Sequence, residues 1–158
     1  MSKKPIQAVC VFQGDIKGYV LFKEDFKNKT VIVKVEIENI PKGKHGIHIH
    51  ETGDLRMGCK SLCAHYNPHG KVHGGRDDKI RHVGDLGNVL ANKNKKVSTT
   101  FSDKLIKLRG KYSIIGRSVV IHEDEDDLGK GGDKESLITG NAGKRIACGV
   151  IGYASTCK

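Results

Sequence analysis

The stretch Thr30–Ile40, TVIVKVEIENI, shows the pattern that decides the fold. Val31, Val33, Val35 and Ile37 fall on one face, and the charged residues Lys34, Glu36 and Glu38 fall on the other. Successive side chains of a β-strand point to opposite faces of a sheet. The alternation therefore predicts a strand with one buried face.

Similar short apolar segments recur along the chain and are separated by turn signals rich in Gly, Asn and Pro. They are Ile6–Gln13, Gly18–Lys23, Gly46–His50, Asp85–Leu90, Val97–Phe101, Leu105–Leu108, Ser113–Ile121 and Ile146–Tyr153. Many short strands at this spacing are typical of an antiparallel sandwich or barrel. The length of 158 residues predicts one domain, so we expect a single all-β domain over residues 1–158.

The composition argues against several classes of protein. Lys and Arg number 28 and Asp and Glu 18, which gives a net charge of +10. The basic residues are scattered and form no aromatic-interleaved motif, so we expect no specific nucleic-acid binding. No apolar run approaches the ~20 residues of a membrane span. The start, MSKKPIQAVCVF, has no long apolar core of a secretory signal, and the five cysteines are an odd number. These features favour a cytoplasmic protein that is not built on a disulfide framework.

Two long segments, 51–84 and 122–145, interrupt the strand pattern. Both are rich in Gly and charged residues and poor in apolar residues. Long loops in a compact domain are usually functional or disordered. These two segments carry or flank the histidines, and this coincidence points to a functional site.

Part of the histidine pattern lies on expected strands. His48 and His50 form a His-x-His pair, and strand alternation places both rings on one face of the sheet. His45 has the opposite parity and is expected to face the other way. His122 ends another expected strand and stands alone, which is more typical of a structural residue than of a ligand.

The other histidines lie in the first long segment. His65, His69 and His73 fall at four-residue intervals, but the intervening Pro and Gly disfavour a helix. A loop can bring any two of them to one ion, so their spacing leaves the ligands open. His82 and Asp85 add a nitrogen and an oxygen, and three imidazoles with a carboxylate suit a four-coordinate zinc site. Imidazole also suits copper, iron and nickel, so the pattern predicts a metal site without naming the metal.

Other catalytic signatures are missing from the sequence. It contains no Gly-x-Ser-x-Gly elbow of a serine hydrolase. The segment Gly129–Gly132 lacks the Lys-Ser/Thr of a phosphate-binding loop and is better interpreted as a tight turn.

Five stretches carry a more specific pattern. They are HGIHIHETGD (45–54), RHVGDLGNV (81–89), IIGRSVVIHE (114–123), DDLGKGGDKES (126–136) and TGNAGKRIACGVIGYA (139–154). Together they closely resemble the copper/zinc superoxide dismutase family, in the family's order and over essentially the whole chain. The resemblance implies an eight-stranded antiparallel Greek-key barrel or sandwich, immunoglobulin-like, with two long functional loops. It also implies an antioxidant enzyme that converts superoxide to dioxygen and hydrogen peroxide by redox cycling of copper.

The resemblance further implies two metal sites that share one residue. Copper would be held by His48, His50, His65 and His122. Zinc would be held by His65, His73, His82 and Asp85. His65 would bridge both ions as an imidazolate, and His69 would not be a ligand. Asp126 matches the family's carboxylate that links a copper-bound imidazole to a zinc-bound one.

Other functional positions follow from the same resemblance. Arg145 matches the arginine that guides and holds the anionic substrate by charge and hydrogen bonds. Thr139 corresponds to the other small gate residue of the channel. Cys59 and Cys148 match an intramolecular disulfide, which leaves as spare thiols Cys10, Cys63 and Cys157. A homodimer and loading by a copper chaperone are also implied.

The sequence departs from the family's usual pattern at several positions. Lys134 and Ile138 change the charge of the loop that steers the anion. Arg76 stands where proline is usual, which predicts a looser zinc loop. Thr52 and Tyr153 alter the expected dimer contacts. The competing interpretation, a copper-delivery or metal-buffering relative, is disfavoured because the copper ligands are complete and the chain has no room for a thiol-rich copper module.

Overall fold

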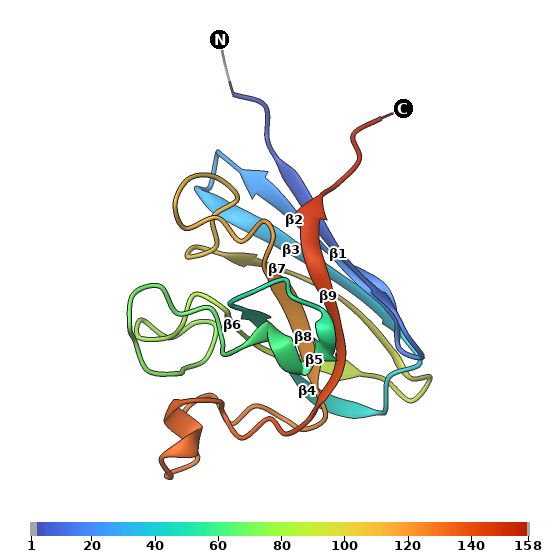
Figure 1. Cartoon of the computed structure of the whole chain (residues 1–158), viewed down its shortest axis with the longest axis vertical. Helices are drawn as coiled ribbons and strands as arrows, with labels where there is room; N and C mark the ends of the chain where they lie inside the picture. Colours follow the sequence, from blue (N-terminus) through green and yellow to red (C-terminus); the bar gives the residue numbers. More distant parts are fainter. Residues whose placement is uncertain (1–2, 158) are drawn as a thin grey trace.

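The alternating segments form β-strands that pair into one curved sheet (Figure 1). The computed structural model describes residues 3–157, where eight strands follow the order β6-β4-β8-β9-β1-β2-β3-β7. The strands are β1 (Gln7–Gln13), β2 (Lys17–Asp25), β3 (Thr30–Glu38), β4 (Gly43–His50), β6 (Asp85–Ala91), β7 (Lys96–Asp103), β8 (Ser118–His122) and β9 (Arg145–Tyr153). All pairings are antiparallel, and β4-β8, β9-β1 and β3-β7 join strands that are distant in the sequence. The predicted all-β Greek-key barrel is therefore confirmed.

The barrel is nearly closed. β6 and β7 stand at the two ends of the strand order and lie close to each other. No hydrogen-bonded ladder joins them in the described part of the chain. We call this gap the seam; it matters for the metal centre because one predicted ligand, Asp85, is the first residue of β6.

The strand that decides the fold behaves as its sequence predicts. In β3, Val31, Val33, Val35 and Ile37 are buried, whereas Lys34 is exposed. β3 pairs with β2 on one side and with β7 on the other. The buried face belongs to a core cluster that receives side chains from all eight strands of the barrel. Burial of this apolar face, at roughly 25 cal/mol per Å², is what selects the strand register.

β4 is buried on both faces and therefore connects the core to the functional region. Ile47 and Ile49 are fully buried in the core cluster. His48 and His50 alternate with them and are also buried. Because alternate side chains of a strand point to opposite faces, the histidines lie on the outer face of the barrel. The long loops cover that face.

One predicted strand does not form. Residues 105–108 make a loop whose only bridge is an isolated one between Lys107 and Ser113. Asp103 Oδ1 accepts the backbone N–H groups of the two residues that begin this loop, at 2.8 and 2.9 Å. Ile106 and Leu108 are nevertheless buried. The period-two pattern here reflects the burial of alternate side chains of a loop. Within the described residues, this segment forms no hydrogen-bonded ladder with another strand.

The two long loops contain short elements that the periodicity did not predict. The first carries β5 (Arg56–Cys59) and the 3₁₀ helix η1 (Lys60–Leu62), and the second carries η2 (Glu135–Leu137). In Figure 1 the second loop, in orange, lies at the end of the barrel away from the two chain ends.

Among residues 3–157 there is no helix with the length and apolarity to cross a membrane.

A disulfide ties the first long loop to the barrel. It joins Cys59, at the end of β5, to Cys148 in β9, with 5.9 Å between the Cα atoms. The pairing implied by the family resemblance is thereby confirmed. Cys10 is a buried thiol, and burial raises its pKa to about 12. Cys63 and Cys157 are exposed thiols.

Two leucines of β6 test the assignment of the core. Leu86 is fully buried, whereas Leu90 is 66% exposed. We expect Leu86→Ala to lower the free energy of unfolding by about 2–5 kcal/mol, because it removes buried methyl groups and leaves a cavity. Leu90→Ala, the matched control, should change it by less than about 0.5 kcal/mol. Urea denaturation measures both, and equal losses would contradict this register of β6.

Candidate metal centre

The first group of histidines lies where β4, β8 and the first long loop meet. His48 and His50 belong to β4, and His122 is the last residue of the neighbouring β8. His65 comes from the loop and joins His50 through an isolated bridge. All four side chains are buried, and each can offer a ligand atom within 4.8 Å of the others.

Each of three rings in this group has one nitrogen held and one nitrogen free. Nδ1 of His50 donates to the carbonyl of Cys63 at 2.8 Å, and Nδ1 of His122 donates to that of Gly143 at 3.0 Å. His48 is held through Nε2 by a carboxylate. The remaining nitrogen of each ring is buried and has no hydrogen-bond partner among the described residues. Unpaired buried acceptors cost free energy, so a metal ion that takes up these lone pairs fits this group.

The second group is centred on the carboxylate of Asp85. Its Oδ1 lies 3.0 Å from Nδ1 of His65, 2.9 Å from Nδ1 of His73 and 3.2 Å from Nδ1 of His82. Its Oδ2 accepts the backbone N–H of Gly74 at 3.0 Å and that of His82 at 2.8 Å. Three imidazole nitrogens around one carboxylate oxygen make a donor set typical of zinc.

One set of four candidate ligand atoms near Asp85 differs from the predicted zinc set by one residue. The residues whose ligand atoms lie within 4.8 Å of one another are His48, His65, His73 and Asp85. His82 is therefore outside this set, although its Nδ1 lies 3.2 Å from Nδ1 of His65. His65 belongs to both groups, and His48 also lies in both sets of candidate ligand atoms.

Burial sets the protonation of the first group. It lowers the pKa of His48, His50 and His65, and it lowers that of His122 to about 4. These rings are therefore neutral near pH 7, the form that binds metal ions. Burial alone would raise the pKa of Asp85, but hydrogen bonds from the surrounding histidines lower it well below its usual range. The second group thus contains a fixed negative charge.

Asp126 joins the two groups. Its Oδ2 accepts a hydrogen bond from Nε2 of His48 at 2.6 Å, and its Oδ1 accepts one from Nε2 of His73 at 2.7 Å. Burial alone would lower the pKa of His73, but its hydrogen bonds to carboxylates raise it to about 9. The Asn88 side chain, on β6, holds the Asp126 backbone through hydrogen bonds of 2.7 and 2.9 Å. The second loop is therefore locked to the barrel at the point where it meets both groups.

A pocket of about 370 Å³ opens beside the first group. It is lined by His50, Ala64, His65, His122, Glu135, Ile138, Thr139, Asn141, Ala142, Gly143 and Arg145. Arg145, the first residue of β9, donates from Nη1 to the carbonyl of Cys59 at 2.7 Å and from Nη2 to that of Cys63 at 2.6 Å. Backbone carbonyls of the disulfide-bonded loop thus orient the guanidinium next to the pocket.

The chain matches a known family along most of its length. The family described as copper/zinc superoxide dismutase (SODC) matches residues 16–151. The chain belongs to the copper/zinc superoxide dismutase family. Its cofactors are accordingly copper and zinc, and the imidazoles and the carboxylate of the two groups are suitable ligands for these ions.

Individual superoxide dismutases show the same relationship. The Cu-Zn superoxide dismutase of Paramecium bursaria Chlorella virus 1 is 59% identical over 152 residues, which cover 96% of this chain and 80% of that protein. The extracellular Cu-Zn superoxide dismutase of Drosophila melanogaster is 52% identical over 155 residues, 94% and 86% of the two chains. Cu-Zn superoxide dismutase 5 of Dictyostelium discoideum is 49% identical over 147 residues, 92% and 97% of the two chains.

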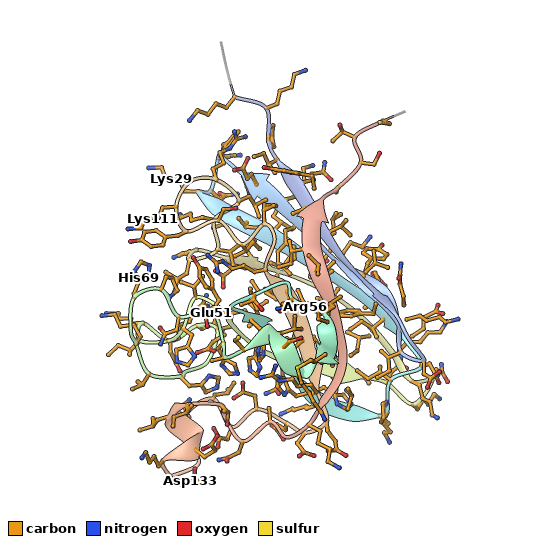
Figure 2. All side chains as sticks on the ribbon, in the orientation of Figure 1. Lys29, Glu51, Arg56, His69, Lys111 and Asp133 are labelled. Atoms are coloured by element: carbon orange, nitrogen blue, oxygen red, sulfur yellow. A yellow bond between two sulfur atoms is a disulfide. The ribbon has the colours of Figure 1, made fainter. Side chains whose placement is uncertain are left out.

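Two histidines lie outside both groups of the dismutase. His69 is exposed at the outer edge of the first loop, with its ring 4.8 Å from that of Tyr112 (Figure 2). His45 is buried, and its ring nitrogens lie 2.9 Å from the carbonyl oxygen of His122 and 2.7 Å from that of Pro41.

Several supports of the site were not predicted. The Asn88 side chain and the carbonyls of Cys63 and Gly143 hold Asp126, His50 and His122 in place. A backbone carbonyl is the same in every residue, so it leaves no signal in a sequence. Asn88 and Asp126 are 38 positions apart in the chain, and no sequence motif connects residues at this separation.

The shifted pKa values predict that the metal-free protein loses stability in acid. An unperturbed histidine titrates near 6.5, whereas folded His122 has a pKa of about 4 and His50 is lowered as well. Between these values the unfolded chain binds more protons, so the free energy of unfolding rises with pH from about 4 to about 6.5. His73 acts in the opposite sense: its contribution is present below 6.5 and is lost as the pH rises through about 9.

Urea denaturation of the metal-free protein across this pH range measures the effect. His122→Gln should flatten the slope in acid, because it removes one group with a lowered pKa. His69→Gln is the matched control, because its ring is exposed and lies outside both groups. Identical slopes for both variants would contradict the assignment to buried histidines.

Proposed function

We propose that this protein dismutates superoxide, converting two superoxide anions and two protons into dioxygen and hydrogen peroxide, as a part of antioxidant defence. The observation that supports this most directly is the sharing of His65 between two groups of metal ligands beside an open pocket. The names and identities of the relatives support the same activity.

We assign the copper ligands as His48, His50, His65 and His122 and the zinc ligands as His65, His73, His82 and Asp85. His82 is preferred to His48 in the zinc set because Nε2 of His48 is taken by Asp126. His48 therefore has only Nδ1 for a metal ion, and that atom is free beside the first group. His82 Nδ1, by contrast, lies within 3.2 Å of both His65 Nδ1 and Asp85 Oδ1.

His65 is the residue suited to bridge the two sites. Its Nδ1 faces Asp85 and His82, which leaves Nε2 for the first group. When bound, copper supplies reversible one-electron exchange with superoxide, whereas zinc keeps one oxidation state and orders its ligands. An imidazolate at His65 would take a proton at Nε2 and deliver it to the product. Asp126 would keep the rings of His48 and His73 in fixed orientations during turnover.

Arg145 and Thr139 would control entry of the anion. Both line the pocket beside the first group. The two hydrogen bonds of Arg145 to loop carbonyls hold its guanidinium in place, so little conformational freedom is lost when the anion binds. Burial lowers the pKa of Arg145, but the group stays charged.

A homodimer, loading by a copper chaperone and a cytoplasmic location are further parts of the proposal. Exposed apolar side chains of Val11 on β1 and Val150 on β9 line the same surface hollow and support the dimer. Apolar patches of this kind are typical of protein interfaces. The Drosophila relative is named extracellular, so similarity alone leaves the compartment open.

The function can be tested by measuring copper content, zinc content and superoxide consumption on one purified sample. The metal-loaded protein should consume superoxide, and the rate should fall as added salt screens the charge around the pocket. Chelated protein is the control. A fully loaded protein with no activity above the chelated control would overturn the proposal.

Arg145→Ile tests the role of the guanidinium. Loss of a charged hydrogen bond of about 1.5–3 kcal/mol should slow turnover by about 10-fold or more, with copper and zinc content unchanged. Arg56→Ile is the matched control, because Arg56 is exposed and bonds to Asp54 outside the pocket. If both variants turn over at the wild-type rate, Arg145 has no part in catalysis.

A further inference from the structure

Arg76 has contacts that the proposed activity does not use. It lies in the first long loop between His73 and His82 and is partly buried. Because Arg76 stands where the family usually has proline, the sequence predicts a looser loop here. In the structure, however, both its side chain and its backbone make specific contacts with the barrel or with residues anchored to it.

The side chain of Arg76 crosses the seam between β6 and β7. Its guanidinium carbon lies 3.9 Å from the centre of the Phe101 ring, which belongs to β7. Its Nη1 donates to the carbonyl of Leu86 at 3.4 Å, and Leu86 follows Asp85 on β6. One planar group thus contacts both strands where no ladder joins them in the described part of the chain.

The backbone of Arg76 is held by a second arginine. The carbonyl of Arg76 accepts a hydrogen bond from Nη1 of Arg81. Arg81 also forms an ion pair of 2.7 Å with Asp103 at the end of β7, and both side chains are buried. The segment from 76 to 81 is therefore attached to β7 at two points, and both points lie between the ligands His73 and His82.

We infer that Arg76 is a positioning residue for the zinc site. By holding the loop and the start of β6 against β7, it keeps Asp85 close to the histidines around it. This inference rests on the assignment of zinc to the Asp85 group. Arginine is suited to the position because its flat guanidinium can stack on a ring and donate a hydrogen bond in its own plane, which a lysine ammonium cannot do.

Zinc release from the copper- and zinc-loaded protein is the most direct test. A chromogenic chelator in excess would report the rate at which zinc leaves. Removal of a residue that supports metal ligands typically weakens metal binding by about 10–100-fold, so Arg76→Ala should release zinc at least about 10-fold faster. Arg76→Lys should restore only part of the wild-type retention. Arg56→Ala, an exposed arginine outside the centre, should release zinc at the wild-type rate.

A double-mutant cycle separates this role from general loss of stability. Phe101→Leu removes the stacking partner and leaves Arg76 in place, so it carries the test if Arg76→Ala does not fold. If the two residues act together, the double variant should release zinc no faster than Arg76→Ala alone. Wild-type release from Arg76→Ala, or multiplicative effects in the double variant, would overturn the inference. A wild-type protein that holds no zinc at the Asp85 group would instead overturn the proposed function.

Discussion

The hydrogen bonds of the Asp126 carboxylate to His48 and His73 connect the parts of this structure that matter for function. Its two oxygens hold rings that come from β4 and from the first long loop. Asp126 itself belongs to the second long loop and is held by Asn88 of β6. One buried carboxylate therefore joins a strand and both loops. Each ring that it holds has its other nitrogen directed to one of the two ligand groups.

The barrel supports this arrangement by the alternation of β4. Ile47 and Ile49 bury one face in the core, and the same alternation places His48 and His50 on the opposite face. Any slip of the strand by one residue would exchange the two sets, at a large cost in buried apolar area. The register that the core selects is therefore also the register that positions the ligands.

The loops depend on a few fixed attachments. The disulfide between Cys59 and Cys148 ties the first loop to β9, and carbonyls of that loop orient Arg145 beside the pocket. Arg76 and Arg81 attach the later part of the same loop to β6 and β7. Long loops are entropically costly to order, so these contacts explain how segments poor in apolar residues hold buried ligands.

The sequence by itself determined the strands and the ligand types. Period two in Thr30–Ile40 predicted β3 because alternation is a local property of the backbone, and His48-x-His50 predicted one shared face for the same reason. The same rule was wrong for Leu105–Leu108, where apolar side chains are buried without a partner strand. Alternation and spacing alone left open which histidines meet; the family resemblance implied the sets, and the tertiary structure brings the side chains together. Asp126 and His48 are 78 positions apart in the chain, and Arg145 and Cys59 are 86 positions apart. Contacts at such distances along the chain depend on how the strands pair and where the loops are attached, and no local pattern of residues records this.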